Sequence, residues 1–228
     1  MVAPTTFHDT ADAAADHPPV LVTGFDAFGG DAVNPSWLAA ERLQERALLG
    51  RPVVAAQLPT QFDLSLQRLR ALLVAHRPAL VICLGYAANR GALSLERVAI
   101  NVNDARIPDN AGQQPIDTPV VAGAPAAYFT RLPIKAMRAA IQEAGIAAEV
   151  SQTAGTFVCN HVFFGLMHEL ATLPGLAETR GGFIHVPPLP EQSKSGMALD
   201  RMVQGIGIGI RTALSVTHDV RLGAGTVA

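Results

Sequence analysis

Cysteine and histidine are the residue types in this sequence whose spacing could support nucleophilic catalysis. The stretch TAGTFVCNHVFFGLMH (153–168) places Cys159 where a glycine-containing loop turns into an apolar helical pattern. A helix N-terminus offers free backbone N–H groups and positive potential, and both favour a thiolate. The pattern therefore predicts a nucleophile at Cys159. A buried core cysteine is the alternative that composition alone favours, and Cys83, in the middle of the apolar run VICLG, exemplifies it.

The histidine that could serve as a base for Cys159 follows by elimination. On a helix, His161 points about 200° away from Cys159, and His168 lies about 13 Å further along the axis. The other remote histidines lie in the N-terminal stretch or at the ends of predicted helices: His8, His17, His76 and His218. His185 remains, at the end of the apolar run GGFIHVP (181–187). It shares a sheet edge with Cys159 if the strands run parallel, so we predict it to be the base.

A carboxylate should hold the imidazole in the correct tautomer, as in other Cys–His and Ser–His systems. Glu96 lies within LSLERVAIN, among apolar residues, where a charged group needs partners in order to ionise. Arg97 could simply neutralise it. Asp104 and Asp109 are alternatives, although their loop equally fits Asx turns. The residues alone leave this choice open.

Other chemistries have weak signals. The helix MHELAT lacks the second histidine of HExxH, because position 172 is threonine, and the chain has no CxxC pair. The segment GFDAFGG (24–30) has neither the GxGxxG spacing nor a GK[ST], so a phosphate or nucleotide module is a weak alternative. GIGIGI (205–210) lies in a helical pattern and fits close helix packing better than a ligand loop.

Composition restricts the protein class. The 228 residues are 49% hydrophobic and 16% charged, with a net charge of -2 and a pI of about 6.4, so nucleic acid and anionic membranes are not expected partners. No apolar run is long enough for a membrane span. Two distant cysteines make no disulfide framework, which favours a reducing cytoplasm. Residues 1–19 contain no Lys or Arg and do not resemble a signal peptide, so we expect a disordered extension.

Apolar runs alternate with helical patterns, which predicts an α/β domain with a mostly parallel twisted sheet between helices. The expected strands are 20–25, 53–59, 79–85, 146–151 and 181–187, and the expected helices are 35–49, 62–76, 133–145, 160–172 and 193–217. Residues 93–104 alternate like a hairpin arm, and 105–125 form a long loop that could be a lid or an interface. We predict one domain over 20–218 and a tail over 219–228.

Five stretches together resemble one family, the type I pyroglutamyl peptidases, also called pyrrolidone-carboxylate peptidases. They are LVTGFDAFGG with NPSW (21–37), G-x2-A-x4-LSLERVAIN (85–101), NDARIPDN with QPID (103–117), SQTAGTFVCN (151–160) and GGFIHVPPLPEQ (181–192). The resemblance runs from about residue 20 to 212.

The resemblance implies a single three-layer α/β/α sandwich, usually a homotetramer, that needs neither metal nor organic cofactor. Members are cysteine omega-peptidases that remove an N-terminal pyroglutamyl (5-oxoprolyl) residue from peptides. The family's catalytic residues fall on Glu96, Cys159 and His185. Its substrate-binding residues fall on positions in the first, third and fourth motifs: Phe25, Phe28, Asn34, Arg106 and Phe157, with Arg106 near the oxyanion.

The chain departs from many relatives at two positions. Tyr86 stands where glutamine is common and Asn103 where aspartate is common, and a side-chain role for position 86 in substrate binding would alter specificity. A flat, uncharged lactam suits aromatic walls and backbone hydrogen bonds, and its pocket should lack a carboxylate that would grip an ammonium. A non-catalytic binder of pyroglutamyl-capped peptides would use the same pocket and is the alternative function.

Overall fold

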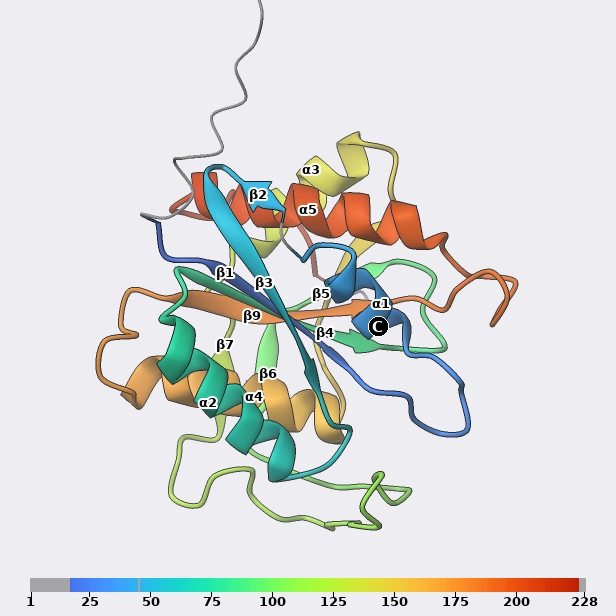
Figure 1. The fold of residues 1–228 in the computed structure, drawn as a ribbon, viewed down its shortest axis with the longest axis vertical. Helices are drawn as coiled ribbons and strands as arrows, with labels where there is room; N and C mark the ends of the chain where they lie inside the picture. The colour runs from blue at the N-terminus through green and yellow to red at the C-terminus, as the bar shows by residue number, and fades with distance from the viewer. Residues whose placement is uncertain (1–16, 45, 226–228) are drawn as a thin grey trace, which may run out of the picture.

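The computed structural model describes residues 17–44 and 46–225. Within these residues a central sheet lies between two layers of helices (Figure 1). Its strands are, in spatial order, β2 (Ala47–Leu48), β3 (Arg51–Leu58), β1 (Val20–Phe25), β4 (Leu80–Tyr86), β9 (Arg180–Val186), β5 (Leu93–Glu96) and β8 (Ala148–Ser151). The predicted α/β class is confirmed.

Strand direction divides the sheet into two parts. Strands β3, β1, β4 and β9 run parallel to one another. Strand β5 is antiparallel to β9, whereas β8 is parallel to β5, and the short β2 is antiparallel to β3. The central strands β1, β4 and β9 read as apolar runs because both of their faces are covered.

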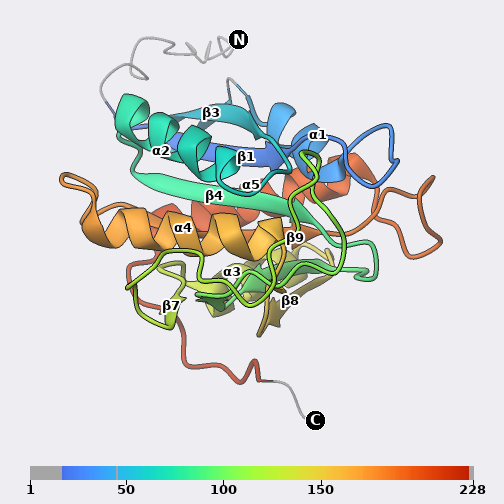
Figure 2. The ribbon, with the colours of Figure 1, turned by 90° about the horizontal axis from the view of Figure 1, so that it is seen from below.

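Helices from distant parts of the chain cover the two faces of the sheet. Helices α1 (Pro35–Glu41), α3 (Ile134–Glu143) and α5 (Leu199–Ser215) pack on one face, and α2 (Leu64–His76) and α4 (Val158–Thr172) pack on the other (Figures 1 and 2). Each face has its own apolar cluster. The side of α2 and α4 is the one that receives the side chains of Phe183 and His185.

Helix α4 is apolar nearly all round because it is covered on both sides. One side packs on the central sheet, and the other contacts a small antiparallel sheet of β6 (Val98–Ile100) and β7 (Ala127–Phe129). The buried Asn160 joins α4 to the small sheet. Its Nδ2 donates to the carbonyls of Ile100 (2.9 Å) and Val102 (3.0 Å), and its Oδ1 accepts from the Ile100 N–H (3.0 Å).

The first glycine of GIGIGI, Gly205, allows helix α5 to approach the sheet closely. A Cβ placed on Gly205 would lie 2.5 Å from Leu93 Cδ1, well inside contact distance. This supports the prediction of close packing at this segment rather than a ligand loop.

Two predicted helices are too long. The helix expected over 35–49 ends at Glu41, because the chain turns through Leu49 and Gly50, which have φ of 52° and 74°, and pairs β2 with β3 as a hairpin. The helix expected over 193–217 begins only at Leu199, after a turn in which Gln192 N–H and Ser193 N–H donate to the Leu189 carbonyl.

The predicted hairpin arm over 93–104 is divided. Residues Leu93–Glu96 join the central sheet as β5, whereas Val98–Ile100 pair with β7 in the small sheet. The long loop that follows contains no helix or strand until β7, apart from a bridge between Asn103 and Thr118.

The ends of the chain are only partly described. The predicted disordered extension lies outside the described residues up to residue 16, as do residues 226–228 of the predicted tail. Asp219, at the start of that tail, accepts hydrogen bonds from the N–H groups of Lys135 and Ala136 and so caps helix α3. None of the helices in the described residues is long and apolar enough to cross a membrane.

Candidate active site

Cys159 occupies the second position of helix α4, at the carboxyl ends of β4 and β9. Its sulfur lies directly over the main chain of Gly85 at the end of β4: a Cβ on that glycine would lie 2.9 Å from Sγ. The strand that precedes the helix, β8, runs antiparallel to β9, so the parallel arrangement assumed for these two strands is wrong. The loop 152–157 returns the chain to this edge, which is why the cysteine still arrives there.

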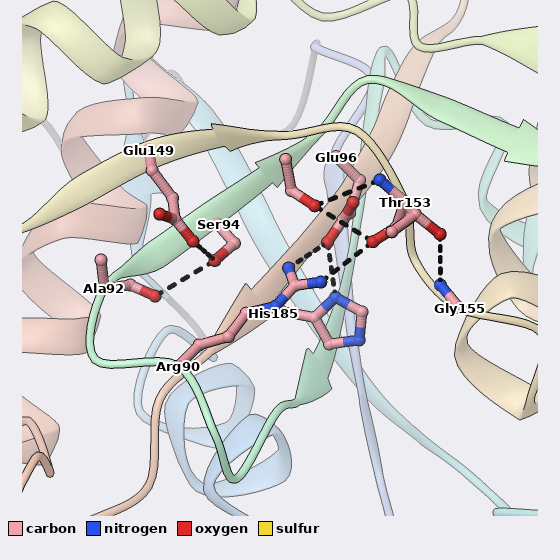
Figure 3. A network of polar contacts seen from close by, with 9 residues as sticks. Arg90, Ala92, Ser94, Glu96, Glu149, Thr153, Gly155 and His185 are labelled. Atoms are coloured by element: carbon pink, nitrogen blue, oxygen red, sulfur yellow. Dashed lines mark hydrogen bonds and ion pairs between the residues drawn. The ribbon is translucent and has the colours of Figure 1, made fainter. Parts of the chain in front are cut away.

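His185 and Glu96 are brought together by the antiparallel pairing of β5 with β9. Ser94 is the register partner of His185, so Glu96, two residues further along β5, presents its side chain on the same face. The His185 Nδ1 and the Glu96 Oε1 are 2.7 Å apart (Figure 3). Both residues are buried, with exposed fractions of 4% and 0%.

The sulfur of Cys159 lies over β4, and the imidazole of His185 belongs to the adjacent strand β9. Gly85, beneath the Cys159 sulfur, is the register partner of His185 in the pairing of β4 with β9. The Phe183 ring packs against both positions: it would contact a Cβ on Gly85 at 2.6 Å, and its centroid is 4.9 Å from that of His185. The register thus places Cys159 and His185 near one ring, and Glu96 is hydrogen-bonded to His185.

Arg90 is a member of this network that sequence reasoning missed. Its Nη1 is 2.6 Å from Glu96 Oε1, and its Nη2 donates to the Thr153 carbonyl at 2.9 Å (Figure 3). Arg97, the alternative partner that could have neutralised Glu96, donates instead to the Ala224 carbonyl at 3.5 Å. Neighbouring residues of a strand point to opposite faces, and this alternation was the signal against Arg97.

The thiol of Cys159 is less acidic than its helix position suggested. Desolvation by burial raises its pKa to about 12, the Glu96 carboxylate acts in the same direction, and the Arg90 guanidinium opposes them. Burial therefore acts against the helix N-terminus, which was predicted to favour a thiolate. Cys83 in the core shows the same effect of burial, with its pKa raised to about 12.

A pocket of about 240 Å³ opens beside Cys159. Five predicted substrate-binding residues line it: Phe25, Phe28, Asn34, Tyr86 and Phe157. Sequence reasoning did not include the remaining lining residues: Gly29, Asp31, Val33, Thr60 and Val158. The ring centroids of Phe28 and Phe157 are 5.3 Å apart, so aromatic faces form the wall.

Two charged residues differ from expectation. Asp31 lines the pocket, although we expected a pocket without a carboxylate; it is exposed, so solvent screens its charge. Arg106 is also exposed and does not line the pocket. Its role near the oxyanion stays a prediction of the family resemblance.

Asn34 has a structural task in addition to lining the pocket. It is the N-cap of α1, where its Oδ1 accepts from the N–H (3.0 Å) and the Oγ–H (2.8 Å) of Ser36. Its Nδ2 donates to the Asp26 carbonyl at 2.8 Å. Asn34 therefore holds the loop that carries Phe28 against the end of β1.

The long loop braces the pocket wall. Asn110 donates from its backbone N–H to the Thr60 carbonyl at 3.1 Å, and from its Nδ2 to the Ala27 carbonyl at 2.9 Å. The Asp109 carboxylate accepts from the Phe62 N–H at 2.8 Å, and its other oxygen organises the loop itself. Asp109 is thus a loop-forming residue, as the Asx alternative predicted.

The histidines of helix α4 are engaged elsewhere. His161 is buried between loop and helix: its Nδ1 lies 3.0 Å from Asn103 Oδ1, and its Nε2 accepts from the Asp63 N–H at 3.2 Å. Burial lowers its pKa from 6.5 to about 4. His168 contacts the Tyr128 hydroxyl at 3.1 Å. Their exclusion as bases agrees with these contacts.

A thiol at a helix N-terminus, next to an imidazole held by a buried carboxylate, is typical of cysteine hydrolases. Among the described residues, no group of three or more His, Cys, Asp or Glu side chains could hold a metal ion.

Comparison with known proteins gives the family. A family model described as pyroglutamyl peptidase matches residues 19–216, and the chain belongs to this family. The resemblance drawn from the five motifs is confirmed, and with it the class of enzyme, a hydrolase of the cysteine omega-peptidase type.

Relatives match over nearly the whole chain. Pyrrolidone-carboxylate peptidase 1 of Ralstonia nicotianae is 53% identical over 91% of this chain and 98% of its own length. The crystal structure of pyroglutamyl peptidase I from Bacillus amyloliquefaciens superposes with a TM-score of 0.87 at 47% identity, covering 91% of this chain and all of that one. The pyrrolidone carboxyl peptidase of Thermococcus litoralis gives a TM-score of 0.86 at 32% identity, over 90% and 99% of the two chains.

Proposed function

We propose that this protein hydrolyses the bond between an N-terminal pyroglutamyl residue and the rest of a peptide, with Cys159 as nucleophile, His185 as base and acid, and Glu96 as the group that orients the imidazole. The single observation that carries the assignment is the 2.7 Å contact between His185 Nδ1 and the buried Glu96. His185 lies on β9, next to the strand β4 over which the Cys159 sulfur lies. Family membership supports the reaction class, and it supports catalysis over the alternative of a non-catalytic binder.

The pocket supports a small, flat, uncharged substrate group. Its volume of about 240 Å³ lies below the range of drug-sized ligand sites and suits a five-membered lactam. Phe28 and Phe157 supply the aromatic wall, and the glycines of the neighbouring loop let main-chain groups approach the ring. Tyr86 also lines the pocket, so its side chain is placed to influence specificity.

Burial raises the pKa of Cys159 to about 12, so the reaction begins from the protonated thiol. His185 Nδ1 faces Glu96, which leaves Nε2 as the nitrogen that takes the thiol proton while sulfur attacks the pyroglutamyl carbonyl. The Glu96 carboxylate then stabilises the imidazolium that forms.

The oxyanion of the tetrahedral intermediate needs donors at the start of α4. The first N–H groups of a helix have no partner within the helix, and that of Cys159 belongs to this set. The imidazolium next gives its proton to the departing amine as the C–N bond breaks, which leaves a thioester. Water, deprotonated by His185, attacks the thioester, releases free pyroglutamate and restores the thiol.

We also propose a reducing compartment, the cytoplasm, because both cysteines are free thiols. The homotetramer remains a proposal from the family resemblance.

The test compares Cys159→Ser with the wild type on pyroglutamyl-, prolyl- and glutaminyl-linked fluorogenic amides. We expect the wild type to cleave only the first, and the variant to lose essentially all turnover while still binding. Cys83→Ala is the matched control, because Cys83 is a buried thiol of β4 that does not line the pocket, and it should keep wild-type turnover. Substantial turnover by Cys159→Ser would exclude this nucleophile.

A further inference from the structure

Arg90 contacts both Glu96 and the loop that precedes Cys159, and the reaction depends on the relative position of these two segments. We propose that Arg90 is a positioning residue of this site: its single guanidinium keeps the Glu96 carboxylate charged and ties it to the loop that delivers Cys159. The proposal rests on the proposed function, because it concerns the geometry of the same catalytic residues.

The charge of Glu96 requires a nearby cation. This carboxylate is fully buried, its Oε1 is shared by Arg90 Nη1 (2.6 Å) and His185 Nδ1 (2.7 Å), and its Oε2 has no hydrogen-bond partner. A buried carboxylate with so few partners is stable as an anion only beside a cation. An imidazole carries a charge only when it is protonated, whereas the Arg90 guanidinium is a permanent cation in contact with this carboxylate.

The same guanidinium contacts the loop 152–157 between β8 and α4. Arg90 Nη2 donates to the Thr153 carbonyl at 2.9 Å, and the same residue accepts at its Oγ1 from the Gly155 N–H at 3.0 Å (Figure 3). The guanidinium therefore holds the loop at a fixed distance from Glu96. Because this loop leads directly into α4, the tie also sets the distance between the imidazole and the sulfur.

The geometry calls for arginine in particular. A planar guanidinium directs two N–H groups to two different acceptors at once, whereas a lysine ammonium provides a point charge on a flexible stem. The Arg90 side chain is 22% exposed, so it is partly shielded from solvent. Within the described residues, the salt bridges to Glu96 come from Arg90 and His185 alone.

Kinetics of Arg90→Met and Arg90→Lys on the pyroglutamyl amide form the first test. Loss of an outer partner that orients a metal-ligating side chain costs about 10- to 100-fold, and Arg90 orients Glu96 in a comparable way. The kcat of Arg90→Met should therefore fall by about that factor, while KM changes little because Arg90 does not line the pocket. Arg90→Lys keeps the charge and should recover part of the loss. Added guanidinium, but not potassium at the same concentration, should raise the activity of Arg90→Ala.

The matched control is Arg70→Met, which removes another short arginine–carboxylate pair. Arg70 Nη1 lies 2.7 Å from Glu169 Oε1 on the exposed surface of α2 and α4, away from the pocket. This variant should keep wild-type kcat and KM. A general effect of losing an ion pair would instead appear in both variants.

The second test does not depend on turnover. Infrared difference spectra at neutral pH should show a protonated carboxyl in Arg90→Met that is absent from the wild type and from the double variant Arg90→Met/Glu96→Gln. Failure of the wild type to cleave the amide would refute the proposed function, but the infrared signal of the carboxyl could still be measured. An Arg90→Met protein with wild-type kcat, or without the protonated carboxyl, would overturn the role of Arg90. If that variant does not fold, wild-type kcat in Arg90→Lys together with no rescue of Arg90→Ala by guanidinium would overturn it.

Discussion

Replacement of Gly85 by alanine tests whether the sulfur is seated on the main chain of β4. The added Cβ would lie 2.9 Å from Cys159 Sγ and 2.6 Å from Phe183 Cζ. Favourable carbon contacts lie at about 3.5–4.0 Å, so the sulfur and the ring must each move by roughly 0.6–1 Å. The ring has little freedom, because Phe183 is fully buried and packs against the rings of Phe163 and His185.

The expected magnitude follows from this displacement. A misplacement of about 1 Å at a reacting centre can lower the rate by about 100-fold, so kcat should fall by that order. Overpacking of a dense core costs about 1–3 kcal/mol of folding free energy. For a chain of this size about 2–4 °C of Tm are lost per kcal/mol, so Tm should fall by about 2–12 °C.

The assay measures kcat and KM on a pyroglutamyl fluorogenic amide, with Tm from thermal denaturation. Gly91→Ala is the control, because a Cβ there would meet its nearest neighbour, the Ser195 carbonyl, at an ordinary 3.6 Å. That variant should retain both activity and Tm. Wild-type kcat in Gly85→Ala would refute the reasoning, since it would mean that the sulfur does not rest on Gly85 during the reaction.

The remaining predictions concern pH and the pocket wall. Burial lowers the pKa of His161 from 6.5 to about 4, so the unfolded chain binds a proton that the folded protein does not, and about 3 kcal/mol of stability present above pH 6.5 is lost as the pH falls toward 4. His161→Gln should flatten the dependence of Tm on pH in this window, and an unchanged slope would contradict the assignment. Asn34→Ala should cost about 1 kcal/mol through loss of the α1 cap. It should also raise KM, because the loop that carries Phe28 loses its anchor at Asp26; a lower Tm with unchanged KM would limit Asn34 to a structural role.

Local features of the chain were predictable from the sequence. The apolar runs of β1, β4 and β9 are buried strands because a strand covered on both faces favours apolar side chains at nearly every position. The motif around Cys159 indicated a helix start, and the helix indeed begins at Val158. The fold class, the family and the exclusion of His161 as a base all followed from patterns that neighbouring residues define.

Features that depend on distant segments were decided only by the tertiary structure. The antiparallel direction of β5 brings Glu96 to His185, and no pattern within LSLERVAIN specifies that direction. Arg90 instead of Arg97 pairs with Glu96 because the path of the loop after β4 determines which guanidinium reaches it. The raised pKa of Cys159 likewise comes from desolvation, which arises only when separate elements pack around the thiol. The sequence by itself therefore determined which residues could react, whereas register and burial decided which groups meet and in what protonation state, because both arise from contacts between residues far apart along the chain.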